Sequence, residues 1–296
     1  MPWILFAIIS AALYAASSLF DKFLIEKKIK DPILLTILGG MIFFIFGLIV
    51  IFFRGFEIFQ PWAIFLLLLS GISTEIALVP YYKALSLEDA SRISPLFQII
   101  PIFVLLLSYI FLGEFLTRNQ LLGFVLILAG SFIISVKKTG GVFRIRKAFL
   151  WVLLSSFLWS IPLVLFKLVA IKENFWSTLT YEAVGVAIGS LILFVYYRNK
   201  FSAEFKKIEP KTWLISCLNE IIYFIGRLCN FYALFLGSVS LVSVLNGFNP
   251  LFVLFFGFIL SKWFPQIVKE NTDKKTIFLK LSAIILMFAG LWLINI

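Results

Sequence analysis

Ionisable side chains stand inside one long apolar stretch of the chain, residues 212–235. Glu220, Tyr223 and Arg227 follow the spacing i, i+3, i+7, which places them on one face of a helix. Asn230 follows within one further turn. A charge inside an apolar run is costly unless it faces a cavity or a partner, so we interpret these residues as a candidate substrate or coupling-ion site. The alternative is a salt link to another helix, with Arg227 reaching the surface.

Further polar residues interrupt other apolar stretches. They are Glu75, Gln98, Ser243 and Asn246. Hydroxyls and amides can bind a polar solute without a charge cost, and they can equally form hydrogen bonds between helices. We select all four as candidate binding or coupling residues, with a purely structural role as the alternative.

Two lysines, Lys22 and Lys167, stand near the ends of the apolar runs 3–20 and 149–170. Their ammonium groups are candidates for attracting an anionic part of a substrate. In the alternative interpretation both side chains simply extend to the aqueous surface.

The composition removes most enzyme chemistry. The chain has no His, the commonest metal ligand and the usual general base near neutral pH. Its two cysteines, Cys217 and Cys229, are twelve residues apart, about 18 Å along a helix, which is too far for a disulfide. There is no phosphate-binding glycine loop and no catalytic triad. We therefore predict no catalytic residues, no metal, no cofactor and no enzyme activity.

The overall composition is that of a membrane protein. Of 296 residues, 62% are hydrophobic and 14% are charged, and the mean hydropathy is +1.07. A soluble domain of this size could not bury so much apolar surface. Ten apolar runs are long enough to span a bilayer as helices: 3–20, 33–53, 62–82, 93–112, 119–136, 149–170, 176–197, 212–235, 239–260 and 277–295. We predict an all-α integral membrane protein with ten transmembrane helices, whose first partner is the lipid bilayer.

The basic residues report orientation. Numbering the connections from one to nine, the odd ones and their flanks hold 21 of the 26 Lys and Arg residues. Basic loops stay in the cytoplasm, so this distribution places both termini outside a cell membrane that the chain crosses several times. The formal charge of +11 then reflects topology and anionic lipid, and we predict no nucleic-acid partner.

The two halves of the chain resemble each other. Leu13–Tyr14 matches Leu158–Trp159 at an offset of 145 residues, the third and fourth runs match the eighth and ninth at 149, and Ala129–Gly130 matches Ala289–Gly290 at 160. The fourth and ninth runs carry the pairs Ser94 and Ser243, and Pro101 and Pro250, and Ser91, just before the fourth run, pairs with Ser240. We predict two five-helix repeats, 1–140 and 141–296. Because five is odd, the second repeat is inverted in the membrane, with a binding site between the halves.

A known family carries similar motifs. The first half contains Tyr81–Leu85, Ser94-Pro95, Pro101, Leu112-Gly113-Glu114, Leu116-Thr117, Gln120, Gly123 and Gly130. This pattern resembles the EamA repeat of the drug/metabolite transporter superfamily. In the second half Ser261-Lys262-Trp263 replaces the Gly-Glu turn. The resemblance implies a ten-span transporter that moves small metabolites, usually outward, through a central cavity. Members are usually described with cytoplasmic termini, whereas the basic residues here indicate the reverse.

The combined expectation is a secondary-active exporter of a small polar or amphipathic metabolite that works by alternating access, as a monomer or homodimer. We expect Glu75 or Glu220 to couple transport to a proton or cation, because a desolvated carboxyl can carry a proton. One alternative is a flippase for a lipid or lipid-linked precursor, favoured by the many Phe residues. A second is a membrane protein that does not transport.

Overall fold

The computed structural model describes residues 1–29, 32–85, 87, 94–135, 147–205, 208–263 and 274–296, and every regular element within them is helical. The helices are α1 (Pro2–Lys27), α2 (Pro32–Arg54), α3 (Pro61–Ile76), α4 (Leu78–Leu85), η1 (Ser94–Ile99), α6 (Ile100–Leu112), α7 (Arg118–Ser135), α8 (Lys147–Ala170), α9 (Phe175–Phe205), α10 (Pro210–Leu236), α11 (Val239–Leu245), η2 (Asn246–Phe248), α12 (Asn249–Trp263) and α13 (Lys274–Ile294). Four of them begin at a proline, whose fixed φ and missing N–H suit the first turn of a helix.

Long apolar helices dominate this arrangement. Seven segments of the described chain have the length and hydropathy to cross a bilayer: Pro2–Asp21, Ile33–Arg54, Pro61–Ala84, Ala148–Ala170, Phe175–Ser202, Pro210–Leu236 and Val239–Gly257. Three shorter apolar helices accompany them, Leu96–Leu112, Arg118–Ile134 and Lys280–Ile294. The chain is therefore a helical membrane protein that crosses the bilayer several times. Ten spans remain a prediction.

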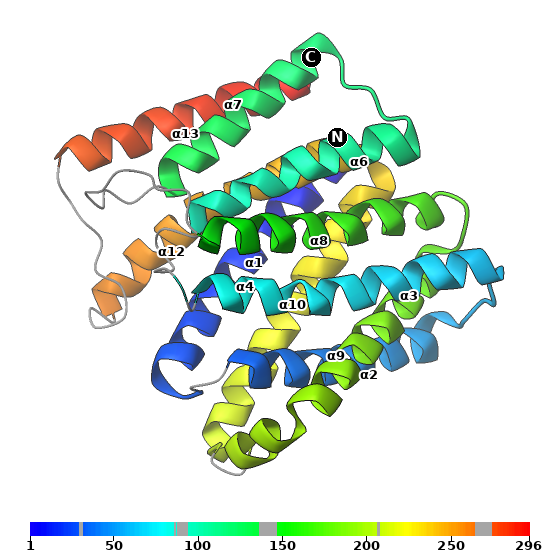
Figure 1. Ribbon diagram of the computed structural model, residues 1–296. Helices are drawn as coiled ribbons and strands as arrows, with labels where there is room; N and C mark the ends of the chain where they lie inside the picture. Colours follow the sequence, from blue (N-terminus) through cyan, green and yellow to red (C-terminus); the bar gives the residue numbers. More distant parts are fainter. Residues whose placement is uncertain (30–31, 86, 88–93, 136–146, 206–207, 264–273) are drawn as a thin grey trace.

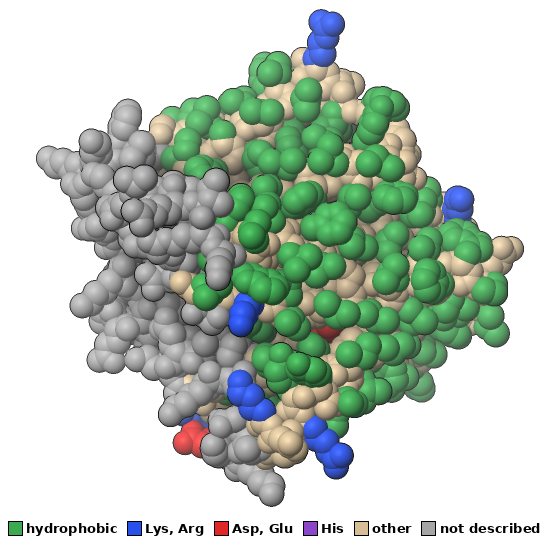
Figure 2. Space-filling view, in the orientation of Figure 1, with side chains coloured by type: hydrophobic (Ala, Val, Ile, Leu, Met, Phe, Trp, Pro, Cys, Tyr) green, Lys and Arg blue, Asp and Glu red, His purple; other side chains and the backbone are tan. Residues whose placement is uncertain are grey.

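Several loops between successive helices lie on one side of the molecule. Those that join α2 to α3, α6 to α7 and α8 to α9 lie together on the right of Figure 1. The outer surface suits a lipid environment, because hydrophobic side chains cover most of the described part of the face drawn in Figure 2, where Lys and Arg side chains are few.

Three helical segments are broken near the middle of the molecule. The α3 helix stops at Ile76 and α4 starts at Leu78, while the 3-10 helices η1 and η2 lead directly into α6 and α12. Pro101 and Pro250 follow these 3-10 turns, and their rings remove N–H donors from the helix. Irregular backbone at membrane depth is tolerated where it lines a cavity. In both helices the structure has a 3-10 break before the proline.

Helix packing has a reciprocal pattern. The α1 helix packs on α10 and α12, whereas α8 packs on α3, α4 and α6. The pair α7 and α13 approaches closely: a Cβ added at Gly123 would lie 2.6 Å from the Gly290 carbonyl oxygen, and one at Gly130 would lie 2.7 Å from that of Ala283. The repeat offset of 160 relates Gly123 to Ala283 and Gly130 to Gly290, so it exchanges the two contacts. The predicted inverted repeat stays a prediction, and this exchange supports it.

Candidate functional site

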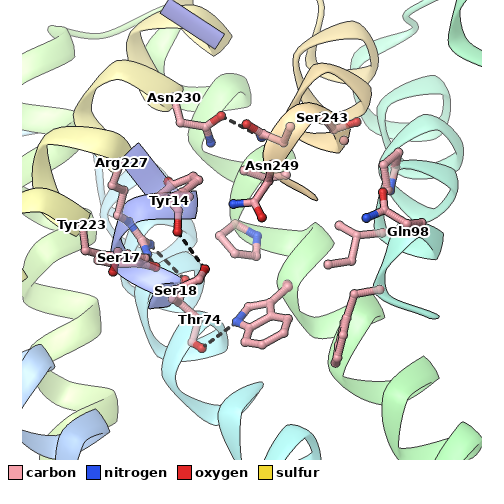
Figure 3. Close-up of a pocket in the computed structure, with 18 of the residues that line it drawn as sticks. Tyr14, Ser17, Ser18, Thr74, Gln98, Tyr223, Arg227, Asn230, Ser243 and Asn249 are labelled. Atoms are coloured by element: carbon pink, nitrogen blue, oxygen red, sulfur yellow. Dashed lines mark hydrogen bonds between the residues drawn. The ribbon is translucent and has the colours of Figure 1, made fainter. Parts of the chain in front are cut away.

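A cavity of about 410 Å³ lies where the broken helices meet. Figure 3 shows side chains from several helices converging on it. It is lined by Tyr14, Ser17, Ser18 and Asp21 of α1; Thr74 of α3; Phe97 and Gln98 of η1; Ile100 and Pro101 of α6; Trp159, Pro162 and Leu163 of α8; Tyr223, Arg227, Asn230 and Phe231 of α10; Ser243 of α11; Asn246 and Gly247 of η2; and Asn249 and Pro250 of α12. Its size fits a small organic molecule.

Six residues selected from the sequence line this cavity: Gln98, Tyr223, Arg227, Asn230, Ser243 and Asn246. Glu75, Glu220 and Lys167 are absent from the lining. Lys22 belongs to α1, but its side chain lies outside the described part of the structure. The structure therefore brings together the amides, the phenol and the guanidinium, and it places the two selected acids behind the cavity wall.

Arg227 is the centre of a buried network. Its Nη2 forms an ion pair with Glu182 of α9 and donates to Thr74 Oγ1 at 3.0 Å, while its Nη1 donates to the Tyr223 hydroxyl at 3.3 Å. The rings of Phe43 and Phe231 lie 5.0 and 5.1 Å from the guanidinium carbon. Arg227 is 5% exposed and Glu182 is fully buried. Because the two charges compensate each other, this network contributes no net charge to the cavity.

Glu75 and Glu220 both lie against α2, beside the adjacent residues Gly40 and Gly39. A Cβ added at Gly39 would lie 2.9 Å from Glu220 Oε1, and one added at Gly40 would lie 3.6 Å from Glu75 Cδ. Glu75 is 6% exposed, and its Oε2 has no hydrogen-bond partner among the described residues. The adjacent glycines thus leave room for two carboxyl groups from α3 and α10 beside α2.

Asp21 is an acid of the cavity that the sequence analysis did not select. Its Oδ1 accepts a hydrogen bond of 2.7 Å from Asn219 Nδ2 of α10. In the sequence Asp21 stands at the end of the first apolar run beside Lys22, a position typical of the membrane surface. Asn219 lies beside Glu220 in an apolar run, and this polar side chain could have indicated that a polar partner from another helix lies next to it.

The described lining of the cavity also contains four amide side chains, those of Gln98, Asn230, Asn246 and Asn249. Asn246 Nδ2 donates to Asn230 Oδ1 at 2.9 Å, and Asn249 Nδ2 donates to the Ala11 carbonyl oxygen at 3.4 Å. The Asn246 Oδ1 atom has no partner among the described residues. Gln98 Oε1 accepts from the Ser131 hydroxyl at 2.9 Å. Figure 3 shows Gln98 across the open space from Tyr14 and Arg227.

Lys167 binds the end of a helix. Its ammonium donates to the carbonyl oxygens of Leu234, Phe235 and Gly237 at 2.6, 3.1 and 3.0 Å, at the C-terminus of α10. Immediately afterwards Glu114 accepts from the Val239 N–H at 3.0 Å, at the start of α11. The two charges match the two helix ends that they meet. Attraction of an anion by Lys167 remains a prediction, and in the structure its donors are engaged by carbonyls.

The cavity lining follows the predicted repeat. The offsets of 145 and 149 residues relate sixteen of the twenty-one described lining residues to one another in eight pairs. These are Tyr14 and Trp159, Ser17 and Pro162, Ser18 and Leu163, Thr74 and Tyr223, Phe97 and Asn246, Gln98 and Gly247, Ile100 and Asn249, and Pro101 and Pro250. Such pairing is expected if the cavity surrounds the axis that relates the two repeats.

The paired positions build two chemically different sides. The polar wall comprises Ser17, Ser18, Asp21, Tyr223, Arg227, Asn230, Asn246 and Asn249, from α1, α10, η2 and α12. The aromatic wall comprises Phe97, Ile100, Trp159, Pro162 and Leu163, from η1, α6 and α8. Within each group the helices contact one another, since α1 packs on α10, η2 and α12, and α8 packs on η1 and α6. Tyr14 and Phe231 add aromatic rings from the helices of the polar wall, and Gln98 adds an amide from η1 of the aromatic wall. The cavity therefore offers one mainly polar and one mainly apolar side to a bound molecule.

Comparisons with known proteins agree with a membrane transporter. Residues 1–136 match the EamA-like transporter family, which confirms the family resemblance of the sequence. A protein of Sinorhizobium sp. described as an uncharacterized transporter in the cobO 3' region is 37% identical over 70 residues, which are 24% of this chain and 50% of that protein. The chain thus spans half the length of this curated relative. A solved crystal structure superposes with a TM-score of 0.75 over 99% of this chain and 98% of its own, and at 17% identity this likeness shows the fold alone.

Proposed function

We propose that this chain, whose first 136 residues match the EamA-like transporter family, is a secondary-active transporter of a small amphipathic metabolite. The observation that carries the proposal is the cavity at the broken helices, lined by residues from both halves of the chain. A transporter needs a solute site between its repeats that each side of the membrane can reach in turn. Export is the direction that the family resemblance favours.

The paired lining residues support alternating access. If the repeats exchange conformations, each residue pair exchanges its surroundings, and the site opens first to one side and then to the other. In this structure Phe166 and Phe231 stack with ring centroids 3.8 Å apart, and Phe231 belongs to the lining. Trp3 packs on Gly237 beyond them. We assign this packed layer to the closed end of the pathway.

Glu220 and Glu75 are the proposed coupling groups. Both carboxyls lie beside Gly39 and Gly40 of α2, and Asp21 of α1 is near enough to Glu220 to interact electrostatically. Three acids that share one buried region favour binding a proton or cation, because like charges destabilise one another there. Movement of α2 would alter the space of both carboxyls, which connects ion binding with the conformational change.

Transport by purified protein in proteoliposomes tests the proposal. We expect one or more solutes of a panel of radiolabelled amines, amino acids and sugars to enter above the level of protein-free vesicles. Asn246→Ala removes the donor to Asn230 and should lower the initial rate about ten-fold. Asn199→Ala, at an exposed site of α9, is the matched control and should leave the rate unchanged.

Two results would overturn this function. The transport function would be wrong if no solute of the panel entered the proteoliposomes above the level of protein-free vesicles. Movement of a fluorescent phospholipid between leaflets, lost in Asn246→Ala and without solute flux, would indicate a lipid flippase instead. For the coupling role, Glu220→Gln should remove the stimulation of uptake by a pH gradient, and full stimulation in that variant would exclude Glu220 as the coupling acid.

A further inference from the structure

Among the described side chains around the cavity, acids outnumber cations. The described helices bring Asp21, Glu75, Glu182 and Glu220 into this region, together with the guanidinium of Arg227. Arg227 is paired with Glu182, and no other ion pair of the described residues involves these acids. The remaining acids can be neutralised by protons or by a positively charged ligand.

Asp21 is the acid that meets the cavity itself. It lies on the polar wall with Ser17 and Ser18, one helical turn from them along α1. The Asn219 amide donates to its carboxyl at 2.7 Å. The repeat offset relates Asp21 to Phe166, so the charge has no counterpart on the aromatic wall. Among the described side chains, the one acid that lines the cavity therefore belongs to the polar wall.

Three aromatic rings are clustered on the other side. Tyr81 of α4, Phe97 of η1 and Trp159 of α8 have ring centroids 5.4, 5.5 and 5.3 Å apart in pairs. Phe97 and Trp159 line the cavity, and the Trp159 Nε1 donates to the Thr74 carbonyl oxygen at 3.3 Å, which holds the indole in place. Tyr81 is near enough to Asp21 to interact with it electrostatically. Aromatic faces attract organic cations as well as apolar groups.

We propose that the cavity binds an organic monocation, with its ammonium group beside Asp21 and its apolar body against Phe97 and Trp159. An anion would face Asp21 and find Arg227 already paired with Glu182. A neutral polar solute would leave the Asp21 carboxylate of the cavity without a compensating charge. The inference rests on the transporter function proposed above and specifies its substrate class.

Binding of matched probes to the purified full-length protein tests the charge directly. Choline, 3,3-dimethylbutan-1-ol and 3,3-dimethylbutanoate have nearly the same shape and are positive, neutral and negative. The 2-phenylethylammonium ion and 2-phenylethanol form a second pair with an aromatic body. We expect at least one cation to bind about ten-fold or more tightly than its neutral isostere in calorimetric titrations. Equal binding, tighter binding of the anion, or no binding of either cation would overturn the proposal.

Three variants separate the charge from the fold. Asp21→Asn keeps the size of the side chain and should reduce the preference for the cation to about two-fold or less, while the neutral isostere binds as before. Glu57→Gln removes an acid from an exposed loop and should retain the full preference. Trp159→Leu should weaken the cation about three-fold or more beyond its effect on the neutral probe. A full preference in Asp21→Asn would exclude Asp21 as the partner of the ammonium.

The two proposals fail in distinguishable ways. If proteoliposomes move a neutral or anionic solute in a manner that requires Asn246, the transporter function stands and the cationic substrate is wrong. If the cations bind with the expected preference but no solute crosses the vesicle membrane under any gradient, the site stands and the transport function is wrong.

Discussion

Four residues of each wall occupy matched positions of the chain, and their chemistry is opposite. At four of the related pairs the residue on the polar wall is Ser or Asn, while its mate on the aromatic wall is Pro, Leu, Phe or Ile. These pairs are Ser17 and Pro162, Ser18 and Leu163, Asn246 and Phe97, and Asn249 and Ile100. The repeat therefore determines where these residues lie, and the residue type at each position determines what it can bind. A site with two equal walls would accept a solute in two orientations, whereas unequal walls favour one.

The largest expected effect on stability comes from removing the buried ion pair of Arg227, a residue of the polar wall. Glu182→Leu leaves the Arg227 guanidinium without its carboxylate, and loss of one partner of a buried pair costs about 3–5 kcal/mol of the free energy of unfolding. We expect a large drop in thermal stability in detergent, measured by tryptophan fluorescence. The double variant Glu182→Leu with Arg227→Met should recover much of this loss. A double variant no more stable than the single one would contradict the pairing.

Exchanging one related pair tests whether the walls are interchangeable. Asn246→Phe removes the amide that donates to Asn230, which costs about 1–3 kcal/mol for an unpaired buried oxygen, and it fills the polar side. We expect transport to fall about ten-fold or more. Adding Phe97→Asn restores the composition of the cavity but not the contact with Asn230 on α10. Recovery of wild-type transport in the exchanged variant would show that the position of the polar group is unimportant.

The aromatic wall is held by one hydrogen bond that can be removed selectively. Trp159→Phe keeps an aromatic ring beside Phe97 but loses the bond from Nε1 to the Thr74 carbonyl oxygen. Such a bond contributes about 0.5–1.5 kcal/mol, so we expect a several-fold weaker affinity for an aromatic cation in calorimetric titrations. Trp292→Phe, on the exposed surface of α13, is the control. Unchanged affinity in Trp159→Phe would indicate that Thr74 does not orient the ring.

The smallest effect is expected far from both walls. Lys167→Met removes the cation at the C-terminus of α10, an interaction that contributes about 0.3–1 kcal/mol. We expect a slightly lower melting temperature and an unchanged preference for cationic probes, because Asp21 is untouched. Lys211→Met, at an exposed position near the start of the same helix, should have no effect on stability. A changed cation preference in Lys167→Met would place Lys167 in the substrate site after all.

Sequence reasoning was most successful where candidates lie on one helix. Tyr223, Arg227 and Asn230 line the cavity together because the 3.6-residue period alone places them on neighbouring positions. Glu220 belongs to the same helix, but α2 covers α10 there, and its carboxyl faces Gly39. Helical periodicity specifies which residues share one face of a helix. It does not specify which other helix packs against each turn of that face.

The missed residues belong to other helices. Glu182 of α9, Thr74 of α3 and Asp21 of α1 reach the polar residues of α10 through contacts between residues far apart in the chain. Their own sequence neighbourhoods do not distinguish them from acids or hydroxyls at a membrane surface. For Glu182 the pairing with Arg227 is set by the packing of α9 and α10 around the cavity.

The sequence by itself determined the membrane location, the apolar helices, the internal similarity of the halves and half of the polar residues that line the described cavity. These follow from composition, hydrophobic periodicity and fixed offsets, which are properties of the chain read in order. Only the tertiary structure decided that Arg227 is neutralised by Glu182, that Asp21 faces the cavity with no ion pair among the described residues, and that the two walls differ. Charge compensation and burial depend on distances between helices, and those distances exist only after the helices have packed.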